Sequence, residues 1–178
     1  MEYLKQKWAF HFHTLDVNHD GVITRGDVEQ IVRDFPKVEG LNEDEGKLAV
    51  QKIAKWWSTQ ILKGREKVTL DDFLNDLEKH YTEDKASFLR TMRQNTEEIV
   101  GIFDADKTKA ISLDNYVKAF QVLGYDNEAL LRQSFELYKP DHGIVSIQEF
   151  IDDWVTFLTN DDPSIPDVVM DTYKNGLI

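Results

Sequence analysis

Residues 16–27, DVNHDGVITRGD, have the residue types and spacing that most directly indicate chemistry. Oxygen-bearing side chains occupy the first, third, fifth, ninth and twelfth positions, and a glycine occupies the sixth. A hard divalent cation such as Ca²⁺ takes about six to eight oxygen ligands, and a loop of this length can wrap them around the ion. Glycine permits the sharp turn because it reaches positive φ without a Cβ clash. The stretch therefore predicts a cation site.

The predicted ligands are oxygens from six residues: the side chains of Asp16, Asn18, Asp20, Thr24 and Asp27, and the backbone carbonyl of Val22. An acidic loop with a glycine can also be a solvated turn, but flanking helices and further copies of the unit favour the ion site. The closing residue is aspartate, which is one methylene shorter than the usual glutamate and reaches less easily with both oxygens. Six-coordinate geometry, which Mg²⁺ requires, is favoured by this change. We predict Ca²⁺ binding with Mg²⁺ competing.

A weaker candidate site lies at residues 104–115, DADKTKAISLDN. Its candidate ligands are Asp104, Asp106, Thr108, Ser112, Asn115 and the carbonyl of Ala110. Lys109 occupies the glycine position, where a positive φ costs about 1 kcal/mol or more. Asn115 replaces the closing carboxylate, so the loop attracts a dication less strongly. Whether this loop binds an ion is left open.

Two further loops are expected to bind no ion. The second begins near Ile61 and places Lys63 and Arg65 at ligand positions, where their charges repel a cation. The fourth keeps Gly143 and a closing Glu149, but counting from Lys139 gives 11 residues where 12 are needed.

Each loop must be held by the helices on either side of it, and apolar residues recur there at helical spacing. Four β-branched residues hold matching places near the loop ends and are expected to pair, first loop with second and third with fourth: Ile23, Val68, Ile111 and Val145. The predicted fold is all-α, with four helix–loop–helix units paired into two packed lobes. The lobes are residues 1–80 and 85–160, followed by a tail at 161–178. The tail is either disordered or docked, and its apolar residues favour docking: Val168, Val169, Met170, Tyr173, Leu177 and Ile178.

The amino-acid composition and net charge of the chain restrict the possible functions. Of the 178 residues, 41% are hydrophobic, which is enough for a packed interior. The formal charge of −12 repels phosphate and anionic lipid, so we expect no nucleic-acid or membrane binding. No cysteine is present, which excludes thiolate sites and disulfides. We expect a cytoplasmic monomer that needs no protein partner, and not an enzyme, because no catalytic motif appears.

Residues 16–27 resemble an EF-hand calcium loop. The unequal loop spacing, the short N-terminal lead, the degenerate second hand and the tail ending YKNGLI together resemble invertebrate sarcoplasmic calcium-binding proteins. That resemblance implies a compact cytosolic Ca²⁺/Mg²⁺ buffer without enzymatic activity. The chain departs from the family pattern at Lys109, at Asn115 and in the shortened fourth loop.

A related branch contains coelenterazine-binding proteins and Ca²⁺-regulated photoproteins. Resemblance to it implies an alternative function: a carrier of a small hydrophobic, luciferin-like ligand, gated by Ca²⁺. The interior residues that would contact the ligand are His11, Trp8, Trp57, Trp154 and Tyr173. Aromatic residues at helical spacing more often form the core. A third alternative, a Ca²⁺ sensor, is weakest because sensors expose methionine-rich grooves and this chain has three methionines.

Overall fold

The structure is a computed structural model that describes residues 1–104 and 107–178. Two successive sets of helices and short strands form it. The first set is α1 (Glu2–Leu15), β1 (Val22–Thr24), α2 (Arg25–Val38), α3 (Glu43–Trp56), the π-helix η1 (Trp57–Leu62), β2 (Lys67–Thr69) and α4 (Leu70–Glu83). The second set is α5 (Lys85–Phe103), β3 (Ala110–Ser112), α6 (Leu113–Val122), α7 (Glu128–Leu137), β4 (Ile144–Ser146), α8 (Ile147–Thr159) and α9 (Val168–Lys174). The predicted all-α fold is confirmed.

The short strands join the loops in pairs. Strands β1 and β2 run antiparallel with Ile23 opposite Val68, and β3 and β4 run antiparallel with Ile111 opposite Val145. Side chains at these positions are β-branched and buried, which suits a short ladder between packed helices. The predicted pairing of first loop with second and third with fourth is confirmed.

The last residue of each loop also lies in the first turn of the following helix. Four capping boxes stand at these helix starts, formed by Thr24 with Asp27, Thr69 with Asp72, Ser112 with Asn115, and Ser146 with Glu149. In each box the two side chains satisfy backbone N–H groups that the first helical turn leaves without partners. A loop that binds no ion therefore still has a reason to keep a polar residue at its end.

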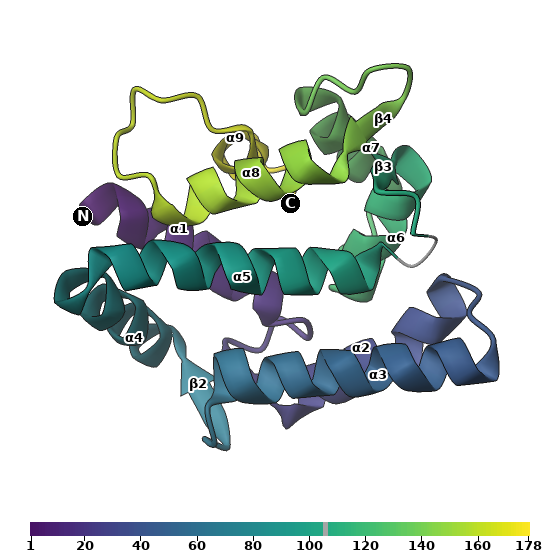
Figure 1. The fold of residues 1–178 in the computed structure, drawn as a ribbon, viewed down its shortest axis with the longest axis horizontal. Coiled ribbons are helices and arrows are strands. Elements are labelled where there is room, and N and C mark those ends of the chain that lie inside the picture. Colours follow the sequence, from purple (N-terminus) through teal and green to yellow (C-terminus); the bar gives the residue numbers. More distant parts are fainter. Residues whose placement is uncertain (105–106) are drawn as a thin grey trace.

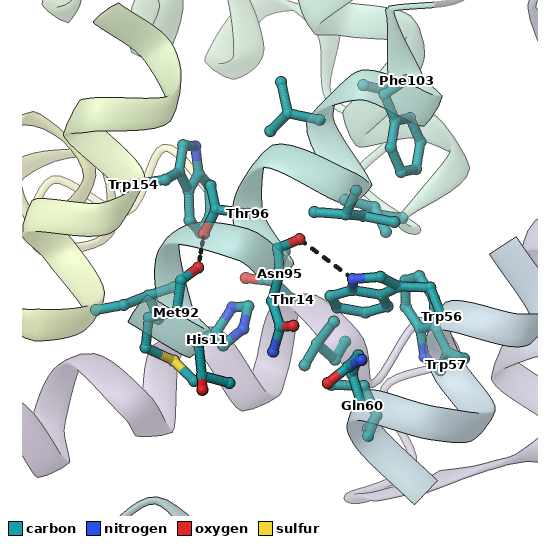
Figure 2. A pocket seen from close by; sticks show the side chains of 18 of the residues that line it. His11, Thr14, Trp56, Trp57, Gln60, Met92, Asn95, Thr96, Phe103 and Trp154 are labelled. Atoms are coloured by element: carbon teal, nitrogen blue, oxygen red, sulfur yellow. Dashed lines mark hydrogen bonds between the residues drawn. The ribbon is translucent and has the colours of Figure 1, made fainter. Parts of the chain in front are cut away.

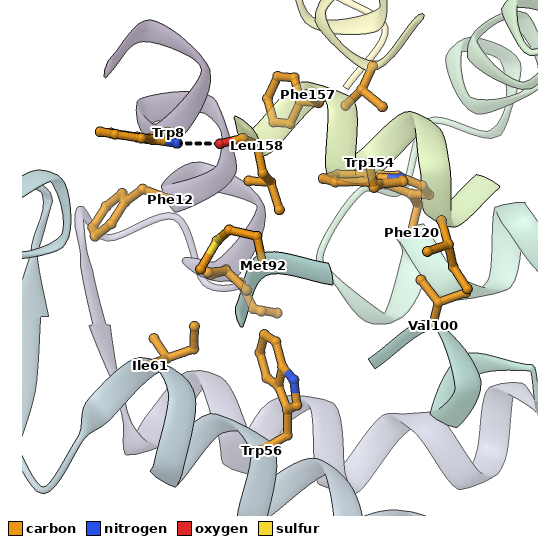
Figure 3. Packing of buried hydrophobic residues seen from close by; sticks show 14 of the residues in the cluster. Trp8, Phe12, Trp56, Ile61, Met92, Val100, Phe120, Trp154, Phe157 and Leu158 are labelled. Carbon is orange, nitrogen blue, oxygen red and sulfur yellow. Dashed lines mark hydrogen bonds between the residues drawn. The ribbon is translucent and has the colours of Figure 1, made fainter. Parts of the chain in front are cut away.

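A continuous cluster of buried apolar side chains connects the two sets of elements. Helix α5 runs across the middle of the molecule, between α8 and α3 (Figure 1). Figure 3 shows Met92 of α5 near the centre of this cluster, with Trp56 of α3 below it and Trp8 of α1 and Phe157 of α8 above it. The division into lobes at residues 80–85 stays a prediction. None of the helices in the described ranges is long and apolar enough to cross a membrane.

The C-terminal tail docks on the rest of the molecule, as expected. Val169, Met170 and Tyr173 of α9 are buried. The Tyr173 ring stacks on Phe10 and Phe157, with ring centres 4.7 and 5.6 Å apart. Its hydroxyl shares a hydrogen bond with Thr14.

A buried ion pair holds the start of this tail. The Lys7 ammonium lies 2.7 Å from Oδ2 of Asp167, and their side chains are 0% and 2% exposed. Lys7 also donates to the carbonyl of Asn160 at 2.8 Å. The other carboxylate oxygen of Asp167 accepts the N–H of Met170 at 2.9 Å and caps α9. Helix α1 is thus tied to the tail by charge as well as by packing.

Candidate metal centre and interior cavity

The first loop is folded around Asp16, which directly follows α1. Oδ2 of Asp16 accepts the N–H of Gly21 at 2.8 Å, and Oδ1 accepts the N–H of Asp20 at 3.2 Å. Gly21 has φ +90°, a conformation that side chains rarely adopt. Asp16 is 1% exposed although it is ionisable, because these N–H groups take the place of water.

Asp27 closes the loop from the first turn of α2. Its Oδ2 accepts the N–H of Thr24 at 2.7 Å, and its Oδ1 accepts the N–H of Asn18 across the loop at 3.2 Å. Asp27 is fully buried. The two ends of the predicted site are therefore fixed by buried carboxylates.

The side chains of Asn18 and Asp20 bond to neighbouring backbone and to each other. Oδ1 of Asn18 accepts the N–H of Asp20, and Oδ1 of Asp20 accepts the N–H of Val22, both at 3.0 Å. Across the described part of the chain, no three His, Asp or Glu side chains converge closely enough to hold a metal ion as they stand. Carboxylates repel one another unless a cation separates them. The donors are all oxygens, which suits Ca²⁺ or Mg²⁺.

In its described part, the third loop has positive φ at the same two positions as the first loop, but both of these residues are lysines. Lys107 and Lys109 have φ 55° and 57°, where the first loop has His19 at 56° and Gly21 at 90°. The lysine in the glycine position thus takes the strained left-handed conformation that the sequence predicts. The predicted ligand Asp106 lies outside the described residues.

Other candidate ligands of the third loop have partners within it. The Thr108 hydroxyl donates to the carbonyl of Ala110 at 3.0 Å, so two predicted ligands bond to each other. Oδ1 of Asn115 accepts the N–H and the hydroxyl of Ser112 at 3.1 and 2.6 Å. Asp104, at the start of the loop, is 9% exposed. Asn115 thus caps α6 but brings no negative charge.

The second loop contains its own cations. The Arg65 guanidinium donates to Oδ2 of Asp76 at 2.7 Å and to the carbonyls of Ile61 and Leu62 at 3.3 and 3.2 Å. Lys63 approaches the same Asp76 oxygen at 3.3 Å. Two positive side chains therefore stand where a metal loop would gather oxygens.

The fourth loop has contracted to a tight hairpin. Asp141 and Ile144 exchange two backbone hydrogen bonds, at 2.9 and 3.1 Å. Between them, His142 and Gly143 have φ 49° and 82°, as in a two-residue turn with positive φ at both central positions. Glu149 accepts the N–H of Ser146 at 3.2 Å and serves as a cap.

The interior contains a cavity of about 350 Å³ between both sets of elements. Its lining is mainly apolar, with residues from α1, α3, η1, α4, α5, α6 and α8. Figure 2 shows Trp56, Trp57 and Gln60 on one side, facing His11 and Trp154 across the space. A volume of this size is at the lower end of the range for small-molecule sites.

Three of the five predicted ligand contacts line this cavity: His11, Trp57 and Trp154. The structure places the other two elsewhere. Trp8 donates its indole N–H to the carbonyl of Leu158 at 2.9 Å, and Tyr173 anchors the tail. Both side chains face inward, as helical spacing predicts, but their rings pack against other side chains.

Each of the three lining residues carries a buried nitrogen without a hydrogen-bond partner among the described residues: Nδ1 of His11, Nε1 of Trp57 and Nε1 of Trp154. Burial lowers the pKa of His11 to about 4, so its imidazole is neutral near pH 7. A neutral imidazole has one donor and one acceptor nitrogen. Buried polar atoms without partners are uncommon and costly, which makes these three atoms candidates for binding a polar group.

Other lining residues were not predicted from the sequence. Helix α5 contributes Met92, Asn95 and Thr96, and α3 contributes Trp56, whose indole donates to the carbonyl of Asn95 at 3.2 Å. Met92 and Thr96 are four residues apart on the buried face of α5, so the helical period was a usable signal.

No protein-family model matches the chain. A sarcoplasmic calcium-binding protein from Mizuhopecten yessoensis is 33% identical over 176 residues, covering 98% of this chain and 99% of that protein. The chain belongs to the sarcoplasmic calcium-binding protein family. The resemblance predicted from the first loop, the unequal spacing and the tail is confirmed.

Solved structures agree with this family fold. The coelenterazine-binding protein from Renilla muelleri, in a Ca-loaded apo form, has TM-score 0.78 at 18% identity and covers 97% of this chain and 94% of its own. A sarcoplasmic calcium-binding protein from amphioxus has TM-score 0.63 at 20% identity, with 97% and 96% covered. The photoprotein n-aequorin has TM-score 0.65 at 18% identity, with 96% and 92% covered.

Proposed function

We propose that this sarcoplasmic calcium-binding protein is a Ca²⁺ buffer whose main ion site is the loop at residues 16–27. The supporting observation is the pair of buried carboxylates, Asp16 and Asp27, that face one loop from its two ends. The name of the relative from Mizuhopecten yessoensis supports the same ion. Loop 104–115 is proposed as a second, much weaker site, because it combines a left-handed lysine with a neutral closing residue.

We also propose that Mg²⁺ competes at the first site. Asp27 begins at the same backbone position as the usual glutamate but is one methylene shorter, so it favours a single oxygen contact. Mg²⁺ requires six ligands in near-octahedral geometry, whereas Ca²⁺ gains from a seventh oxygen. The substitution Asp27→Glu is therefore expected to reduce competition by Mg²⁺.

Calorimetric titration of the EDTA-stripped protein with Ca²⁺, alone and in millimolar Mg²⁺, tests the ion site. We expect one main binding event that Mg²⁺ weakens and that Asp16→Ala abolishes. Asp141→Ala is the matched control, because it removes one acidic charge from the contracted fourth loop, where the side chain is 93% exposed. Equal loss in both variants would contradict a specific site, and an unchanged titration in Mg²⁺ would contradict competition.

A second function, supported by the cavity, is carriage of a small hydrophobic ligand under control of the ion loop. Thr14 and Leu15 line the cavity and directly precede Asp16, so the two features share one stretch of chain. The three unpartnered nitrogens of His11, Trp57 and Trp154 support a ligand with a polar group.

Tryptophan fluorescence tests this carrier function, since three tryptophans line the cavity. We expect decanol, a neutral amphiphile, to bind saturably and with different affinity in Ca²⁺ and in EDTA. Ala119→Phe fills the cavity and is expected to abolish binding. Ala86→Phe, at an exposed position of α5, is the control and is expected to retain it. No saturable binding by the unmodified protein would contradict the carrier function.

A further inference from the structure

The cavity has a polar end between η1 and α4. Four polar residues of its lining lie there: Gln60, Lys63, Asp76 and His80. The Lys63 side chain is 49% exposed and that of Asp76 is 34% exposed, whereas Trp57 and Met92 deeper in the lining are buried. The lining is therefore exposed to solvent at this end, which we call the Lys63 mouth.

We propose that the cavity binds an amphiphile with an anionic head, a medium-chain carboxylate, whose head pairs with Lys63 while its alkyl chain fills the apolar interior. This inference rests on the carrier function proposed above.

Charge at the mouth supports an anionic head. Two cations, Lys63 and Arg65, share the single carboxylate of Asp76, and Arg65 is the closer at 2.7 Å against 3.3 Å. Arg65 also donates to the carbonyls of Ile61 and Leu62, so its position is fixed by the end of η1. The two cations and one carboxylate thus have a net charge of +1, and Lys63 is the more loosely paired of the two cations.

The apolar interior determines the orientation of such a ligand. A carboxylate moved into the buried part would lose hydration without gaining a charged partner, which is strongly unfavourable. At the mouth, the same carboxylate keeps partial hydration and gains the lysine. The net charge of −12 opposes an approaching anion at long range. Salt screens that repulsion beyond about 8 Å, while the contact with Lys63 is local.

Three probes that share an alkyl chain, decanoate, decanol and decylammonium, separate the head group from the chain. Titrations of the full chain are followed by tryptophan fluorescence. We expect decanoate to bind most tightly, and Lys63→Met to weaken it about fivefold, as for a partly exposed ion pair, while decanol binding is unchanged. Lys67→Met is the matched control: Lys67 is an exposed lysine of β2 outside the lining, and its loss should change neither affinity.

Two further variants are expected to change the affinity for decanoate in opposite directions. Asp76→Asn removes the shared carboxylate and is expected to strengthen decanoate binding. Arg65→Met makes Lys63 the single cation paired with Asp76 and is expected to weaken decanoate binding. Decanol binding by the same variant reports whether the cavity is intact. Equal binding of decanoate and decanol that Lys63→Met leaves unchanged would overturn the head-group assignment but keep the carrier function. Tightest binding of decylammonium would overturn the assignment as well, and no binding of any probe would overturn both proposals.

Discussion

His11 shows how burial fixes the chemistry of one residue. Its imidazole packs against Phe73 and Trp154, with ring centres 5.8 and 6.1 Å away, and Nδ1 has no partner among the described residues. Burial disfavours the charged form and lowers its pKa to about 4 from 6.5. His13, two residues later, is exposed. The side chain that faces the cavity is therefore neutral in the folded protein near pH 7.

This depressed pKa predicts acid sensitivity. Because the unfolded chain protonates His11 near pH 6.5 and the folded chain only near pH 4, the unfolded state binds more protons between these values. Stability contributed by His11 is complete above pH 6.5 and falls as the pH drops toward 4, by about 3 kcal/mol in all. Urea unfolding in EDTA across this window should show a smaller loss for His11→Gln than for the unmodified protein.

Comparison between variants is needed because protonation of Asp153 stabilises the folded protein as the pH falls, which opposes the effect of His11. Burial, and then the nearby charge of Asp167, raise the pKa of Asp153 to about 6, so acidification relieves its desolvation. His13→Gln is the control and should follow the unmodified protein. Parallel pH curves for His11→Gln and the unmodified protein would contradict the assigned shift.

At the scale of elements, the tail is held by a contact that could not be predicted from the sequence. Lys7, in the stretch MEYLKQKWAF, reads as a surface lysine, yet its ammonium is fully buried against Asp167. The partner lies in the tail, where no local spacing relates it to α1. Similarly, the π-helix η1 and the Arg65–Asp76 contact, which joins the loop after η1 to α4, follow no helical spacing in the sequence.

Breaking this ion pair from one side is predicted to be costly. Lys7→Met leaves the Asp167 carboxylate buried without its cation, so we expect a loss of about 3–5 kcal/mol in the free energy of unfolding. Lys5→Met, on the same helix as Lys7, is the matched control: it breaks a partly exposed pair with Glu78 of α4 and should cost much less. Urea denaturation measures both. Equal small losses would show that the tail is held by packing alone, and adding Asp167→Asn to Lys7→Met should recover part of the loss.

At the scale of the whole molecule, apolar packing crosses between the two sets of elements. Trp56 of α3 bonds to α5, and α5 packs against α8, so residues far apart in sequence share one core. The four loops keep their capping boxes whether or not they have metal ligands. We therefore expect the fold to depend on the core more than on bound ions.

This arrangement predicts a folded state without metal. In EDTA the protein is expected to unfold cooperatively on heating. Ca²⁺ should raise the midpoint temperature, because binding to the first loop stabilises the folded state. Circular dichroism during a thermal scan measures both effects, and Asp16→Ala should remove the Ca²⁺-dependent rise alone. A broad, non-cooperative transition in EDTA would contradict this prediction.

Helical spacing and loop chemistry predicted the fold and the location of the first loop, because both follow from local sequence. Ile23 opposite Val68 is an example, since matching places in two loops imply pairing. The cavity lining was predicted less well. Trp8 and Trp57 both face inward, but whether an inward ring meets empty space or another ring depends on the packing of all the helices together.

The fourth loop and the third loop lack a complete ion site for different reasons, because a short hairpin replaces the fourth loop. In the third loop, Lys109 and Asn115 occupy the right places with the wrong side chains, so two point substitutions, Lys109→Gly and Asn115→Glu, would supply the missing turn and carboxylate. The two-residue turn at His142 and Gly143 lacks chain length, which no substitution supplies. Substitutions alone can therefore restore the third loop, whereas the fourth loop can be restored only if a residue is inserted.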